Sequence, residues 1–312
     1  IATRGKIMKR ILLTTTSLIL AAGFAHADVT FSGKGEVGIY QDEAANTAAV
    51  SVAGTQAAAD TAGTSRSTVM TVYSGYDLNV AVSGASDNGI TFSMGFDMGA
   101  GMLADRDDDY AIDAQGATIG TSALTIGYAG VTIVAGQDKI DDLYSDSQNG
   151  DVSISGAFGD LSFSVVADTD SGQNANSMSL SGAAGDMSWG FVTTDDNGSV
   201  TSDSASKVTV GYTVSDALSM SFKHDTKGAA TAINTIGATL TMGSLTLGLS
   251  ADDNNDNDIS VGYAAGPLSA AYGSNEDDEW KFNTSYDLGG GASAFASVDH
   301  SEFTVLGMSF AF

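Results

Sequence analysis

The residues best able to do chemistry in this sequence are carboxylates, and many of them gather in short runs. Three such runs lie at 105–109, 252–258 and 275–279. Carboxylate oxygens are the ligands that Ca²⁺ prefers. Carboxylates that line a channel also attract cations and repel anions, an effect that salt screens over about 8 Å at physiological ionic strength. The runs therefore predict cation binding, or else plain solvated charge on outer loops.

The run 252–258 is the best candidate for a metal site, through Asp252, Asp256 and Asp258. It begins like a calcium-binding loop, with acids and amides at alternate positions. An EF-hand loop needs Gly where this run has Asn257, and a bidentate Glu where the chain has Tyr263. We therefore expect no resident cofactor, and at most loosely bound Ca²⁺ at these carboxylates.

Catalytic groups are scarce. The chain has no Cys, which removes thiolate nucleophiles, thiolate metal sites and disulfides. Ser204 and Lys207 have the spacing of a Ser-x-x-Lys nucleophile, but they lie in a Ser-rich segment rather than at a helix start. No constellation of carboxylates singles out His224 or His300. The sequence predicts no catalytic residue and no enzyme.

The charge balance excludes another class of partner. The 312 residues carry 38 acids and 12 bases, a net charge of −26. Binding to a phosphate backbone needs a surface rich in Lys and Arg. Nucleic acid is therefore not an expected partner.

The first residues have the pattern of an export signal. A basic start at Met8–Arg10 precedes an apolar stretch at 11–24 and a small-x-small site at 25–27. This three-part pattern is typical of a secretory signal peptide. We expect residues 1–27 to be a signal for Sec-type export, with Met8 as the start, and residues 28–312 to form one domain.

The remaining chain alternates between apolar and polar residues almost throughout. In 90–98, for example, Ile90, Phe92 and Met94 share one face, whereas Thr91 and Ser93 share the other. Similar alternation over 7 to 11 residues recurs down the chain to 302–312. A period of two predicts β-strands, and no segment keeps a helical period.

The turns between these strands indicate how the sheet closes. Eight short turns rich in Gly, Asn and Asp alternate with longer acidic connections, and tight hairpins favour these residues because they need positive φ. Short turns at one rim and long loops at the other are typical of an up-and-down antiparallel transmembrane β-barrel. Eight turns, with both chain ends on the turn side, predict eighteen strands; sixteen is the second choice.

One face of each strand must then meet lipid and the other water. The strand lysines fall on the polar rows, where Lys34, Glu36, Lys223 and Lys281 are candidates for the channel wall. Five aromatic residues lie just before short turns, as an aromatic belt at a membrane interface would. They are Tyr128, Phe158, Tyr212, Tyr263 and Tyr286.

Several segments resemble a known family. The last strand, 303–312, alternates and ends in Phe312, like the assembly signal of bacterial outer-membrane barrels. The segment 28–38 is similar to the first strand of general diffusion porins, and 285–293 and 155–161 resemble hairpins of the Rhodobacter-type porins of alphaproteobacteria.

The resemblance implies a homotrimeric, water-filled pore in the outer membrane of a Gram-negative bacterium. Its partners would be outer-membrane lipid, lipopolysaccharide and, during biogenesis, the barrel-assembly machinery. The third extracellular loop of that family folds into the barrel and faces arginines on the wall. The equivalent loop here is 137–151, whose candidate acids are Asp138, Asp141, Asp142 and Asp146; Arg66 is a candidate on the arginine side.

The function that these patterns favour is a passive, cation-preferring porin for small hydrophilic solutes. A substrate-specific outer-membrane channel is the alternative within the same architecture, although the polar rows lack the aromatic track such a channel would need. A secreted acidic β-rich adhesin or surface protein is the alternative from another class. The preferred solute and the pore diameter stay open.

Overall fold

A computed structural model describes residues 27–41, 70–107, 109–116, 119, 122–145, 148–169, 176–196, 203–226, 228 and 230–312. The predicted signal peptide, 1–27, lies outside these residues except for Ala27, which begins the first strand. Arg66 and Asp146 also lie outside the described residues. Among the residues described, no helix is long and apolar enough to cross a membrane.

The described chain is built from strands. Their bounds are β1 Ala27–Gln41, β2 Thr71–Ala85, β3 Thr91–Ala104, β4 Ile112–Ala114, β5 Leu124–Tyr128, β6 Val131–Asp141, β7 Asn149–Phe158, β8 Leu161–Ala167, β9 Ser177–Ala184, β10 Met187–Thr194, β11 Ala205–Ser215, β12 Leu218–Asp225, β13 Ile233–Met242, β14 Leu245–Asp252, β15 Asn257–Ala265, β16 Leu268–Asn275, β17 Trp280–Gly289, β18 Ala292–Asp299 and β19 Thr304–Ala311.

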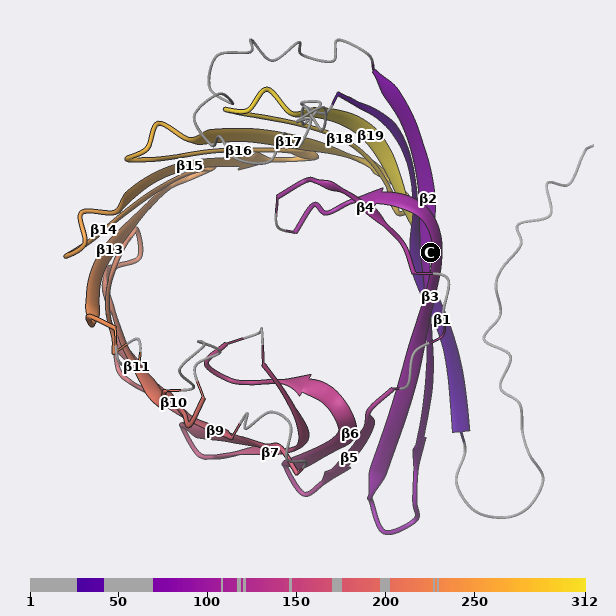
Figure 1. Ribbon diagram of the computed structural model, residues 1–312, viewed down its shortest axis with the longest axis vertical. Coiled ribbons are helices and arrows are strands. Elements are labelled where there is room, and N and C mark those ends of the chain that lie inside the picture. Colours follow the sequence, from indigo (N-terminus) through magenta and orange to yellow (C-terminus); the bar gives the residue numbers. More distant parts are fainter. Residues whose placement is uncertain are drawn as a thin grey trace, which may run out of the picture.

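Eighteen of these strands close into one antiparallel barrel, as Figure 1 shows. Each barrel strand pairs with its neighbours along the chain, and β1 pairs with both β2 and β19. The strand β3 pairs directly with β5, so the three-residue β4, which pairs only with the end of β3, lies outside the wall. The prediction of eighteen strands is confirmed.

Short turns lie at one rim of the barrel, together with both ends of the described chain. Eight of them join barrel strands that follow one another in the chain, from β2–β3 to β17–β18, and eight is the number that the sequence predicts. Gly159 and Gly185, for example, adopt φ of 60° and 61°, a conformation that costs other L-residues energy. At the seam, Gly33 and Phe312 exchange two backbone hydrogen bonds of 3.1 and 3.0 Å, which close the ring.

Two rows of side chains run around this wall. Residues directly opposite one another on paired strands share a face. One row therefore continues through Phe31, Val80 and Phe96, and the other through Ser32, Asn79 and Asp97. The first row is apolar yet exposed: Phe31 is 49% exposed. It is the outer face, because two loops fold inside the ring (Figure 1) and hydrogen bond there to Glu36 and Thr194 of the second row.

Candidate functional site

The acids and lysines of the barrel strands gather on the inner row. Outside the irregular end of β6, every Asp, Glu and Lys in the barrel strands lies on the inner row. The acids are Asp28, Glu36, Asp77, Asp97, Asp151, Asp225, Asp252, Asp258, Asp287 and Asp299, and the bases are Lys34, Lys207, Lys223 and Lys281. Charged side chains need water or a partner, so the interior is a polar, hydrated space.

The connection between β3 and β5 folds into this space. Gly101, at φ 81°, turns the end of β3 away from the wall, and β4 then pairs back onto 102–104. The backbone N–H of Ala104 donates a 3.0 Å hydrogen bond to Glu36 Oε2 on β1. Arg106 reaches β18, where its guanidinium lies 4.5 Å from the Phe295 ring centroid and donates to Ser293 Oγ at 3.3 Å.

An apolar cluster holds this connection against the inner wall. Tyr110 on the connection packs on Phe295, with ring centroids 6.2 Å apart. Tyr73, Ala104 and Val305 complete the cluster. These wall residues stand on the inner row, which elsewhere carries mainly small or polar side chains, and the connection removes them from water. Hydrophobic burial therefore fixes one inward-folded loop over β1, β2, β18 and β19.

The connection between β6 and β7 also folds inward, over a different part of the wall. Asp142 is buried: its Oδ1 accepts the N–H groups of Tyr144 and Ser145, and its Oδ2 accepts the Thr194 hydroxyl of β10. The Leu143 N–H donates to Ser177 Oγ on β9 at 2.9 Å. Polar contacts thus hold this loop, whereas apolar packing adds to the hydrogen bonds that hold the first.

The tip of this second loop reaches β11 and β12. The Tyr144 hydroxyl donates a hydrogen bond to Asp225, which is only 2% exposed. Lys207 Nζ lies 4.6 Å from the Tyr144 ring centroid, a cation–π distance. Together the two loops cover parts of the inner wall on different sides of the ring (Figure 1). Among the described contacts, neither loop hydrogen bonds to or packs against the wall from β13 to β17.

The four predicted wall residues all lie on the inner row, in different settings. Lys34 stands opposite Asp77, Lys281 opposite Asp299, and Lys223 opposite Thr209 and Thr235. Glu36 is only 4% exposed because the β3–β5 connection covers it. Glu36 therefore anchors a loop and does not face open water.

The predicted acids of the β6–β7 loop are divided in the same way. Asp138 and Asp141 are exposed, whereas Asp142 is buried against the wall. Asp138 adopts φ 51°, and its N–H donates to Asp151 of β7 at 2.9 Å. The structure thus brings Asp142 to the wall as an anchor and leaves Asp138 and Asp141 in contact with water.

The acidic run 252–258 forms the tight β14–β15 connection. Asp252 Oδ1 accepts the N–H groups of Asn254 and Asp256, at 2.8 and 3.1 Å, so this carboxylate caps the turn. Its negative charge also raises the pKa of Asp256. In the described part of the chain, no group of three or more Asp, Glu, His or Cys side chains is arranged to hold a metal ion. Calcium binding by Asp252, Asp256 and Asp258 stays a prediction.

The outer row has the character of a membrane surface. A soluble protein does not leave a continuous band of large apolar side chains exposed. The five predicted belt residues are all on this row near the short turns, with exposures of 58% (Tyr128), 71% (Phe158), 51% (Tyr212), 43% (Tyr263) and 47% (Tyr286). Aromatic rings at this level suit the boundary between lipid and water.

A barrel with a charged interior, a lipid-facing exterior and inward-folded loops is the architecture of a diffusion channel. The family model described as "Gram-negative porin" matches residues 14–305. The chain belongs to this family. This porin is therefore an integral outer-membrane protein that crosses the membrane with many strands and forms a channel, and its fold and family point away from an enzyme.

Comparison with other proteins adds a likeness among solved structures. Three engineered variants of the porin of Rhodopseudomonas blastica each match with a TM-score of 0.49 and 17% sequence identity, covering 91% of this chain and 100% of theirs. No curated protein gives a significant match.

Sequence reasoning missed the residues that hold the β3–β5 connection. The signal for them is present: Tyr73, Phe295 and Val305 are large apolar residues on the inner row, where water would otherwise meet them. Such residues mark a place that an inward loop covers. Val166 on β8, which is 1% exposed, stands on the same row opposite Ser177, whose hydroxyl oxygen accepts the Leu143 N–H of the β6–β7 loop.

Proposed function

We propose that this porin is a passive channel that prefers cations and admits small hydrophilic solutes. The observation that carries the proposal is the charge of the inner row, where ten acids face four bases. Fixed charge inside a low-dielectric wall sets up a potential that concentrates ions of the opposite sign.

The positions of the lysines strengthen this imbalance. Lys34, Lys207 and Lys281 each stand directly opposite an acid on the next strand. Opposite charges at cross-strand distance cancel each other at longer range. Acids without a base opposite them, such as Asp97 and Asp258, then dominate the field that a passing ion meets.

The turn-side half of the interior supports a channel without strong substrate choice. Many of its facing pairs are hydroxyls, among them Ser83 with Ser93, Ser162 with Ser181, and Ser269 with Ser285. Hydroxyl groups solvate many polar solutes about equally well. This lining favours general diffusion over a substrate-specific channel.

The test is the reversal potential of the purified protein in a planar bilayer across a KCl gradient. We expect a potential that favours K⁺ over Cl⁻. The variant Asp97→Lys should move it toward zero or toward Cl⁻, because Asp97 lies on the inner row. The matched control Asp160→Lys, in the short β7–β8 turn, should leave it nearly unchanged.

Anion preference in the parent protein would contradict the charge argument while keeping the channel. An absence of conductance from protein that migrates on gels as a folded, heat-modifiable barrel would contradict the channel itself.

We also propose that the porin forms a homotrimer. Its outer row would contact outer-membrane lipid and lipopolysaccharide. It would reach the membrane through Sec-type export and the barrel-assembly machinery. The exposed apolar row supports contact with lipid and lipopolysaccharide. The exposed ring of Phe312, which lies beside Gly33, supports recognition by the barrel-assembly machinery. Cross-linking in native membranes tests the trimer. N-terminal sequencing of the exported protein tests the removal of residues 1–27, and we expect its first residue to be Asp28.

A further inference from the structure

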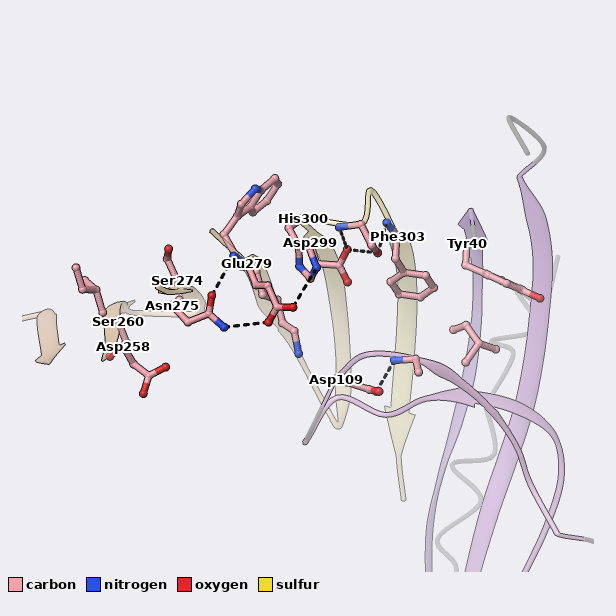
Figure 2. A pocket seen from close by; sticks show the side chains of 17 residues that line it. Tyr40, Asp109, Asp258, Ser260, Ser274, Asn275, Glu279, Asp299, His300 and Phe303 are labelled. Carbon is pink, nitrogen blue, oxygen red and sulfur yellow. Dashed lines mark hydrogen bonds and ion pairs between the residues drawn. The ribbon is translucent and has the colours of Figure 1, made fainter. Parts of the chain in front are cut away.

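A pocket of about 740 Å³ lies at the loop-side mouth of the channel. One side is the tip of the β3–β5 connection, with Asp109 and Ile112. The other is the loop-side end of the wall from β15 to β18, with the β18–β19 turn and Tyr40 of β1, as Figure 2 shows. We propose that this pocket binds small organic cations that carry an apolar body, and holds them before they enter the channel. The inference rests on the proposed cation preference and adds a ligand class and a site.

The first argument is the charge of the lining. Four carboxylates border the pocket, from Asp109, Asp258, Glu279 and Asp299, against one lysine and one histidine. The lysine, Lys281, stands opposite Asp299 on the neighbouring strand. The histidine, His300, lies with Nε2 3.8 Å from Glu279 Oε1. Both basic groups therefore have a carboxylate beside them, and the pocket as a whole stays negative.

The second argument is that several of these carboxylates are held in place. Glu279 Oε2 accepts the Asn275 side-chain amide at 2.9 Å. Asp299 Oδ1 accepts both the backbone N–H and the hydroxyl of Ser301, at 2.9 and 2.6 Å. A fixed acceptor loses less conformational entropy on binding than a mobile one, and each of these contacts uses one oxygen of the carboxylate.

The third argument is the apolar part of the lining. Tyr40 and Phe303 border the same pocket, and their rings are 6.5 Å apart. Phe303 and Tyr40 also pack against the buried cluster that holds the β3–β5 connection. Their rings are thus supported from behind, and present carbon surface to whatever occupies the pocket.

Carboxylates beside aromatic rings suit one ligand chemistry best. An ammonium group gains from the carboxylates and from the faces of the rings, and its hydrocarbon part gains from ring contact. A bare metal ion would leave the rings unused, and no described side-chain cluster is arranged to hold one. An anion would meet a surplus of negative charge. The volume lies in the range of pockets that take small organic molecules.

The experiment measures block of the K⁺ current through single channels. Phenethylammonium and ethylammonium carry the same charge and differ in their ring, and each is added first to the loop side and then to the turn side. We expect phenethylammonium to block at a concentration about fivefold lower than ethylammonium, as the ring contact implies. We expect its block to be stronger from the loop side, where the pocket opens.

The variant Asp258→Asn/Glu279→Gln should weaken block by phenethylammonium about tenfold, because it removes two of the four carboxylates. The matched control is Asp277→Asn, which removes an acid from the same β16–β17 turn without touching the pocket lining. Heat-modifiable migration shows that each variant is folded.

Equal block by the two amines, or equal block of the double variant and the control, would overturn the inference. So would block by an uncharged disaccharide with none by phenethylammonium, which would assign the pocket to sugars. The reversal potential of the same channels separates this failure from that of the proposed function: K⁺ preference without amine block rejects the pocket alone.

Discussion

Replacing Phe295 with Ala should release the β3–β5 connection and widen the channel. Phe295 is 2% exposed, so its ring lies beneath the connection and does not itself line the open pore. It contacts the connection twice, through the Tyr110 ring at 6.2 Å and the Arg106 guanidinium at 4.5 Å. Loss of the ring removes both contacts while the backbone pairing of β18 stays available.

The size of the effect follows from these two contacts. An aromatic pair and a cation–π contact contribute about 1 kcal/mol each. Their loss lowers the free energy that holds the connection by about 2 kcal/mol, which raises the undocked population about thirtyfold. The hydrogen bond from Ala104 N–H to Glu36, worth about 2 kcal/mol, remains. The connection should therefore open intermittently and not permanently.

The assay is single-channel conductance in KCl, read together with the noise of the open-channel current. Phe295→Ala should raise both. The control is Phe282→Ala on the neighbouring strand β17, where the ring is on the outer row and 40% exposed. It loses a similar ring without touching the connection, so its conductance should match that of the parent. Parent-like conductance and noise in a folded Phe295→Ala barrel would refute the reasoning.

Two further predictions concern the other loop and one rim carboxylate. Tyr144→Phe removes the hydroxyl that donates to the buried Asp225. This should weaken the attachment of the β6–β7 loop to the wall by about 1–3 kcal/mol and increase the noise of the open-channel current. Unchanged noise would count against Tyr144 as an anchor of the loop. The Asn234 side-chain amide and backbone N–H hold the pKa of Asp253 below its ordinary value. The stabilisation of the fold by these hydrogen bonds to the ionised carboxylate is complete above the ordinary pKa of Asp. It is lost as the pH falls through the lowered pKa of Asp253. Asn234→Ala should raise the pKa of Asp253 toward the ordinary value, as ¹³C NMR of its carboxyl group in micelles would show; an unchanged titration would contradict it.

Much of the wall could be predicted from local patterns. Alternation along a strand decides which residues share a face, and Gly-rich turns decide where the chain reverses. Both signals lie within about ten residues, which is why the eight turns, the eighteen barrel strands and the aromatic belt from Tyr128 to Tyr286 follow from the sequence. The polar row that carries Lys34 and Lys281 follows in the same way.

The paths of the loops were decided only by the tertiary structure. Arg106 meets Ser293 across 187 positions of the chain, and Tyr144 meets Asp225 across 81. No local period encodes such contacts, because they depend on barrel closure, which pairs β19 with β1, and on the curvature that places β12 within reach of the β6–β7 loop. The same closure buries Glu36, which the sequence predicts as an open wall residue, and sets Asp109 across a pocket from Asp258. Strand chemistry determines the barrel, and the meeting of distant segments inside it determines how the channel is lined.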